Sequence, residues 1–211
     1  NREDVIRKIW SGFHWDVVII DGEEEARYIF AGTMEALPVS DQPCLIMDIG
    51  GGSVEFILSK AGKMLWWASV SIGVQYLYLH FNRNAPILPE EEVALDSKLD
   101  QDLARLKEAI NRYKPLYLAG ASGAFDELLQ MSNITMGEKY TVLDIGIFHE
   151  NYEKLRKQVM ERRNRPTVRT EERPEIVMTG FQLIRYVLRL FDAKEIITTP
   201  FALREGVFFS G

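Results

Sequence analysis

The feature that most constrains this chain is a glycine triplet, residues 50–52, which follows directly on an apolar run ending in Asp48 and Ile49. An apolar run of this kind predicts a buried strand. Glycines without a Cβ then allow a tight turn whose N–H groups can surround a phosphate. Asp48 and Glu55 flank the turn, and carboxylate oxygens suit a hard cation such as Mg²⁺. The pattern predicts a phosphate-binding turn beside metal-binding acids, although by itself it also fits a plain hairpin turn.

Composition narrows the class of protein. With 211 residues the chain can form one large domain or two small lobes. A formal charge of −6 argues against non-specific nucleic-acid binding. The single cysteine, Cys44, excludes an intramolecular disulfide and agrees with a reducing cytoplasm, where we expect the protein. Residues 64–82 contain no Lys, Arg, Asp or Glu, but polar residues interrupt them, so we expect no membrane span.

A second acidic cluster precedes the glycine triplet. The β-branched run Val17–Ile20 predicts a short buried strand, and Glu23, Glu24 and Glu25 then open a helix that extends to Leu37. Acids in a first helical turn are stabilised by the helix dipole, which is sufficient to explain them. A functional interpretation would require one of them to point back toward the glycine triplet.

Periodicity along the rest of the chain predicts a mixed α/β fold with a five-stranded sheet flanked by helices. The five expected strands are the one before the glycine triplet and residues 54–58, 64–72, 116–119 and 196–198. The expected helices cover residues 3–11, 23–37, 74–81, 90–113, 125–129, 148 onward, 176–191 and 203–206. Residues 132–147 give no clear prediction.

Two further segments have two possible interpretations each. The stretch Gly120-Ala121-Ser122-Gly123 lies between an expected strand and an expected helix, so it is either a second phosphate or nucleotide corner or an ordinary turn. The basic segment Arg162–Arg173 is either a solvated face, as its interleaved glutamates favour, or a contact for a polyanion.

Two motifs together resemble the exopolyphosphatase and guanosine-pentaphosphate phosphohydrolase family. They are Gly22-Glu23-Glu24-Glu25-Ala26-Arg27 and Asp48-Ile49-Gly50-Gly51-Gly52-Ser53-Val54-Glu55, and the likeness continues through Ser71-Ile72-Gly73 and Leu203-Arg204-Glu205-Gly206. The resemblance implies a ribonuclease-H-like lobe of the actin-like ATPase fold. It also implies Mg²⁺-supported release of the terminal phosphate from inorganic polyphosphate or guanosine pentaphosphate.

The resemblance also assigns roles to individual residues. It implies that Glu25 is the general base and that Asp48 and Glu55 lie at the metal and the attacking water. The residues it implies for phosphate binding are Gly50, Gly51, Gly52 and Ser53, with Gly120, Ser122 and Gly123 at the second corner. A carboxylate base acts better when its pKa is raised, and Glu23 and Glu24 are hypothesised to contribute to this.

Some features depart from the family pattern. The family has an earlier lobe with its own Asp-x-Gly-Ser-Asn-Ser loop, and nothing here matches it, so we expect a fragment. Residues 1–37 would then be the tail of the first lobe and residues 38–211 the second lobe. Asp21 stands where the family often has serine, and the second corner lacks the usual Gly-Gly-Thr ending.

Two alternatives remain from the sequence. One is a non-catalytic sensor of polyphosphate or a guanosine polyphosphate, and the other is an actin-like ATPase or kinase of another family. The oligomeric state, monomer or homodimer, is left open.

Overall fold

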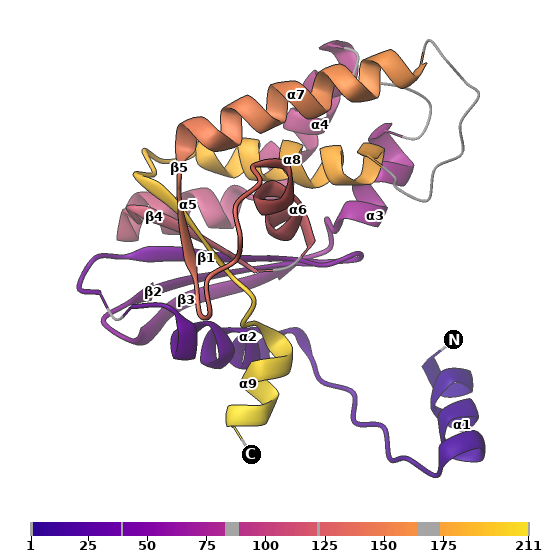
Figure 1. Cartoon of the computed structure of the whole chain (residues 1–211). Helices are drawn as coiled ribbons and strands as arrows, with labels where there is room; N and C mark the ends of the chain where they lie inside the picture. Colours follow the sequence, from indigo (N-terminus) through magenta and orange to yellow (C-terminus); the bar gives the residue numbers. More distant parts are fainter. Residues whose placement is uncertain (1, 39, 83–88, 122, 164–173, 211) are drawn as a thin grey trace.

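The structure is a computed structural model that describes residues 2–38, 40–82, 89–121, 123–163 and 174–210 (Figure 1). The strands are β1 (Cys44–Ile49), β2 (Val54–Lys60), β3 (Lys63–Val70), β4 (Tyr117–Ala121), β5 (Thr141–Asp144) and β6 (Glu195–Thr199). The helices are α1 (Arg2–Phe13), α2 (Gly22–Ala36), α3 (Val74–Leu77), the π-helical turn η1 (Tyr78–Asn82), α4 (Pro89–Asp102), α5 (Ala104–Tyr113), α6 (Gly123–Met131), α7 (Ile145–Arg163), α8 (Pro174–Leu188) and α9 (Leu203–Phe209).

The strands form one mixed sheet in the order β3-β2-β1-β4-β6-β5. The hairpin-connected strands β1, β2 and β3 are antiparallel, whereas β1, β4 and β6 run parallel to one another. The short strand β5 pairs antiparallel with β6 at the far edge. Because the carboxyl ends of parallel strands meet at one edge, the turn after β1 and the start of α6 after β4 lie at the same edge of the sheet. The expected mixed α/β fold is confirmed.

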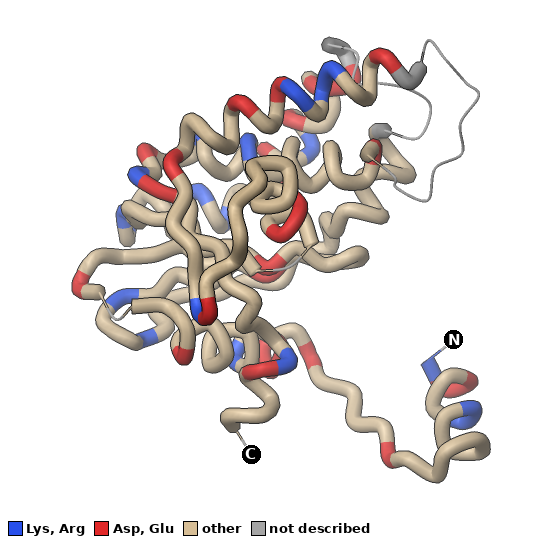
Figure 2. The backbone as a smooth tube through the Cα atoms, viewed as in Figure 1, with Lys and Arg blue, Asp and Glu red and all other residues tan. Residues whose placement is uncertain are grey.

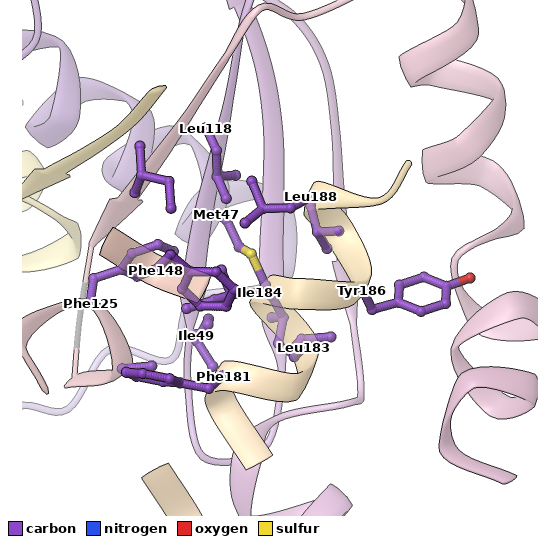
Figure 3. Close-up of a cluster of buried hydrophobic side chains, with 14 of the residues drawn as sticks. Met47, Ile49, Leu118, Phe125, Phe148, Phe181, Leu183, Ile184, Tyr186 and Leu188 are labelled. Carbon is purple, nitrogen blue, oxygen red and sulfur yellow. The ribbon is translucent and has the colours of Figure 1, made fainter. Parts of the chain in front are cut away.

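Helices cover both faces of the sheet (Figure 1). The larger core lies between one face and helices α3 to α8. Figure 3 shows Phe148 of α7 and Phe181 and Ile184 of α8 together with Met47 and Leu118 of the sheet. Helices α2 and α9 pack on the other face, where α2 lies over a smaller cluster that includes Ile46 and Ile57. Apolar residues alternate along β1 and β2 between these two cores, which explains why both strands are almost wholly buried.

The helices α2 and α9 are in backbone contact. A Cβ at Gly206 of α9 would overlap the carbonyl of Tyr28, and a Cβ at Gly32 of α2 would overlap that of Ala202. Glycine is therefore required at both positions by the close approach of the two helices. Helix α2, which carries Glu25, is in this way held between the sheet and α9.

The sheet has six strands, so the expectation of five is wrong. The additional strand is β5, of which only Leu143 is buried while its neighbours are partly or fully exposed. Four residues at a sheet edge give too short an alternation to stand out in a sequence.

Two other expected elements differ. Residues Val17–Ile20 form no strand: Val18 is 82% exposed and Ile19 41% exposed, and no described strand pairs with them. A β-branched run favours extended backbone, but a strand also needs a hydrogen-bonding neighbour. The single helix expected over residues 90–113 is interrupted at Leu103, which has φ −98° and ψ 17° and separates α4 from α5.

The N-terminal helix α1 has no buried residue and stands apart from the sheet and its helices (Figure 1). The boundary expected between residues 37 and 38 stays a prediction, and α2 packs directly on the sheet of the expected second lobe.

In the part of the chain that the structure describes, no helix is both long enough and apolar enough to cross a membrane. Helix α7 carries both acidic and basic residues (Figure 2), and its last two residues begin the expected basic segment. Residues 164–173 of that segment lie outside the described residues.

Candidate active site

A row of polar residues crosses the first three strands on the face that α2 covers. Asp48 of β1 pairs with Glu55 of β2, and Glu55 pairs with Ser69 of β3. Cross-strand partners project from the same face of a sheet. Glu55 is only 2% exposed, and the Ser69 hydroxyl donates a 2.7 Å hydrogen bond to its Oε1. The register therefore brings the two expected metal-binding acids together.

Helix α2 places Glu25 at the same edge. Its N-cap is Asp21, whose Oδ1 accepts hydrogen bonds from the N–H groups of Glu23 and Glu24 at 3.0 and 2.9 Å. Aspartate and serine are both strong N-caps, so the departure from serine at this position preserves the start of the helix. A Cβ at Gly22 would lie 3.1 Å from the Cβ of Ser69, so the helix begins directly against the polar row.

The carboxyl group of Glu25 is half-buried, and its pKa is raised by burial first and by the charge of Glu55 second. The approach of the start of α2 to Ser69, together with this charge interaction, places Glu25 near the polar row. The hypothesised contribution of Glu23 and Glu24 is not found, because these acids have other partners. Glu23 forms a 2.6 Å ion pair with Arg27, and Glu24 accepts a 3.3 Å hydrogen bond from the Tyr28 hydroxyl.

The glycine turn, residues 50–53, is held by its own backbone and by the start of α3. The Gly50 N–H donates to the Ser53 carbonyl at 3.0 Å, which closes the turn. All three glycine carbonyls also accept hydrogen bonds: Gly50 from Val74 at 3.0 Å, Gly51 from Gln75 at 3.0 Å and Gly52 from Gly73 at 3.1 Å. With its carbonyls engaged in this way, the turn has a fixed conformation before any ligand arrives.

The turn leaves hydrogen-bond donors available to an anion. Among the described residues, the backbone N–H groups of Gly51, Gly52 and Ser53 make no hydrogen bond. A Cβ at Gly52 would meet no atom within 4 Å. At Gly73, by contrast, a Cβ would overlap the backbone of Gly51, so glycine is required there for α3 to reach the turn. Successive free N–H groups in a tight turn are suited to binding a phosphate.

The second glycine corner is at the end of β4, where Ala121 pairs with Asp48. Gly120 is buried, and a Cβ there would overlap the ring of Phe125. This glycine therefore has a packing role that accounts for its presence. Gly123 begins α6, and a Cβ there would meet open space. Ser122 lies outside the described residues.

The carboxylates of the polar row can be compared with what a metal ion needs. Within the described ranges, no group of three or more His, Cys, Asp and Glu side chains is arranged to hold a metal ion by itself. Mg²⁺ does not need such a group, since it usually binds one or two carboxylates together with water and substrate phosphate oxygens. The neighbouring carboxylates of Asp48 and Glu55, next to the glycine turn, fit that mode of binding.

Sequence reasoning missed Ser69 as a member of this site. Its signal was weak: a serine at a position of β3 whose register partner in β2 is an acid. Without the pairing of β2 with β3, nothing in the sequence connects Ser69 with Glu55.

The mixed sheet, the glycine turn after its first strand and the acids on one face define a ribonuclease-H-like lobe of the actin-like ATPase fold. The chain belongs to the Ppx/GppA phosphatase family, whose model matches residues 1–211.

Individual relatives agree with this assignment. An exopolyphosphatase structure from Cytophaga hutchinsonii is 33% identical with a TM-score of 0.90, over 100% of this chain and 70% of that one. The Aquifex aeolicus PPX-GPPA enzyme is 23% identical with a TM-score of 0.78, over 99% of this chain and 70% of that one. A guanosine-5'-triphosphate,3'-diphosphate pyrophosphatase of Vibrio atlanticus is 26% identical over 92% of this chain. The chain spans 38% to 64% of the length of three curated relatives that it matches.

Proposed function

We propose that this chain carries part of the catalytic machinery of a hydrolase that removes the terminal phosphate from a chain of phosphoanhydride bonds. One observation supports this most: Glu25, Asp48 and Glu55 come from different elements to one edge of the sheet, next to the glycine turn. A phosphate held by the turn would lie close to these carboxylates. Phosphoryl transfer depends mainly on positioning and charge stabilisation, and these are the properties that such an arrangement supplies.

In the proposed reaction, backbone N–H groups of the glycine turn donate hydrogen bonds to oxygens of the terminal phosphate. Glu25 accepts a proton from water as the water oxygen bonds to the terminal phosphorus. The bond between that phosphorus and the bridging oxygen breaks, and the shortened substrate leaves with the bridging oxygen. The raised pKa of Glu25 favours this role, since a carboxylate with a higher proton affinity is a better base.

Asp48 and Glu55 would hold Mg²⁺ in this proposal. When bound there, the cation would supply positive charge to offset the negative charge of the phosphate oxygens. The Ser69 hydroxyl orients the carboxylate of Glu55 through its 2.7 Å hydrogen bond.

The proposed substrates are inorganic polyphosphate and guanosine pentaphosphate. The Cytophaga relative is described as an exopolyphosphatase, and the Vibrio relative as a guanosine-5'-triphosphate,3'-diphosphate pyrophosphatase. Both substrates present a terminal phosphoanhydride to the same kind of turn. Phosphate release from each, measured side by side, separates the two.

Replacing Glu25 tests the proposal. In the natural protein that contains this chain, Glu25→Gln should reduce phosphate release by about two to four orders of magnitude. Glu24→Gln is the matched control, because Glu24 is engaged with Tyr28, and it should retain activity. Wild-type turnover by Glu25→Gln would contradict the assigned base. Substrate binding without any turnover in the wild-type protein, measured by calorimetry, would indicate a sensor instead.

We further propose that residues 1–37 belong with an earlier lobe that completes the cleft. The exposed side chains of α1 and of Val18 and Ile19 support this, because apolar surface of that kind needs a packing partner. The 211-residue chain alone should then release phosphate far more slowly than the longer protein.

A further inference from the structure

A cavity of about 310 Å³ opens on the α2 face of the sheet, at the edge opposite the glycine turn. Its floor is a second row of register partners: Ser59, Cys44, Tyr117 and Glu195, on β2, β1, β4 and β6. Cys44 precedes Asp48 by four positions on β1, which at about 3.3 Å per residue separates the two rows by roughly 13 Å. The cavity is therefore distinct from the proposed phosphate site.

The walls of the cavity are mainly apolar, and they come from the end of α2 on one side and from the segment around β5 on the other. The end of α2 contributes Met34 and Leu37, and the β5 side contributes Tyr140 and Val142. The Lys139 ammonium donates a 3.0 Å hydrogen bond to the Glu35 carbonyl, which joins the β5 side to α2. The cavity thus has a fixed frame, and its size falls in the range of small-molecule sites.

Polar and charged side chains in the lining distinguish this cavity from a packing defect. Ser59 is only 4% exposed, and it lines the floor of the cavity. Lys60 lines the cavity on the β2 side, and Glu195 lines it on the β6 side, two strands further along the sheet from β1. Burial raises the pKa of the Cys44 thiol to about 12, so this side chain acts as an apolar part of the floor.

We propose that the cavity binds a small aromatic monocarboxylate. The ring would lie on the floor formed by Cys44 and Tyr117 beneath Leu37, and the carboxylate would meet Lys60 and the hydroxyl of Ser59. At the β6 side of the cavity, the carboxylate of Glu195 would repel a second negative charge on the ligand. A polyphosphate therefore does not fit. This inference goes beyond the proposed hydrolase activity and does not depend on it.

Three probes that share the indole ring and differ in charge test the proposal on the 211-residue chain: indole-3-acetate, indole and tryptamine. Binding is measured by saturation-transfer NMR and by titration of backbone amide shifts. Indole-3-acetate should bind with a Kd on the order of 1 mM, as expected for a ligand of its size, and shift the amides of residues around Ser59 and Tyr117. Indole should bind about tenfold more weakly, and tryptamine more weakly still.

Two variants locate the site. Lys60→Met should reduce the affinity for indole-3-acetate about tenfold, to that of indole. Val142→Trp should abolish binding, because Val142 is 44% exposed and its larger replacement would fill the cavity. Val207→Trp is the matched control: Val207 is 49% exposed on α9, does not line the cavity and should leave binding unchanged.

Several outcomes would overturn the proposal: no binding of indole-3-acetate, equal binding of tryptamine, or undiminished binding by Val142→Trp. A chain that is dimeric in light scattering and becomes monomeric with Val142→Trp would also overturn it, because a second copy of the chain would then be the occupant of the cavity.

Discussion

At the scale of single residues, Glu25 shows how neighbours set the chemistry of a carboxylate. Burial and the charge of Glu55 both raise its pKa, so protonation is easier in the folded than in the unfolded chain. A base of this kind is active only when deprotonated, and activity should fall as the pH drops through the raised pKa. The free energy of unfolding has the opposite dependence: the folded state binds the proton more tightly, so stability falls as the pH rises through the pKa of the folded state.

A neutral side chain at position 25 should therefore stabilise the fold. We expect Glu25→Gln to have a higher Tm than wild type at pH 7 to 8. The difference should disappear as the pH falls below the ordinary carboxyl pKa of 4.5, where Glu25 is protonated in both states. Thermal unfolding over this pH range measures it. Glu23→Gln is the control, since Glu23 is exposed and paired with Arg27. A Tm difference that does not vary with pH would disprove the effect.

Two glycines near the turn should respond differently to a methyl group. Gly73→Ala should lower the free energy of unfolding by about 1–3 kcal/mol, because the new Cβ would overlap the backbone of Gly51. Gly52→Ala should leave stability unchanged but reduce phosphate release about tenfold to a hundredfold, because its Cβ would stand where a phosphate approaches. Urea unfolding and phosphate-release assays of both variants provide the comparison, and equal loss of stability would refute it.

Not every glycine of a motif could be interpreted from the sequence. The glycine turn was predictable, because three consecutive glycines after a buried strand strongly favour a tight turn of the backbone. Gly120 was predicted to contact phosphate on a similar pattern, and this stays a prediction; the structure adds a packing reason for the glycine, because a Cβ there would overlap the ring of Phe125. Sequence cannot separate these cases, since the side chain that requires the glycine comes from the following helix and its direction depends on packing.

At the scale of elements, the contact between α2 and α9 positions the proposed base. Gly206→Ala should destabilise the protein by about 1–3 kcal/mol, because a Cβ there would overlap the Tyr28 carbonyl. The displaced α2 should also reduce phosphate release. Gly12→Ala is the control: Gly12 lies in α1 with nothing within 4 Å of its Cβ, and its Tm should not fall. Wild-type stability of Gly206→Ala would show that the two helices can separate freely.

Most elements could be predicted, and the failures have a common physical cause. Strands β1 and β2 and helices α2 and α8 combine clear periodicity with burial. The run Val17–Ile20 has strand-like residues but no partner among the described strands, and β5 has a partner but only one buried residue. In both cases the outcome depends on what lies beside the segment in space, which local sequence does not contain.

At the scale of the whole molecule, the N-terminal arm, residues 2–20, lies apart from the body formed by the sheet and its covering helices (Figure 1). Deleting residues 2–20 should leave the Tm of the remaining chain unchanged, because α1 has no buried residue and the following segment is largely exposed. Differential scanning calorimetry of both chains measures this. Deletion of residues 203–210, which contain α9, should by contrast lower the Tm markedly. A lower Tm after removal of the arm would indicate contacts that stabilise the body.

The pairing of α2 with α9 also has a consequence for how the protein is made. The helix that carries Glu25 is synthesised early, but its packing against α9 cannot form until Gly206 has been synthesised and can contact Tyr28. Strand β6, which lies between β4 and β5, is likewise synthesised after the strands that it joins. Contacts between such distant parts of a chain form slowly. The nascent chain should therefore bring Glu25 to Asp48 and Glu55 only after Gly206 has been synthesised.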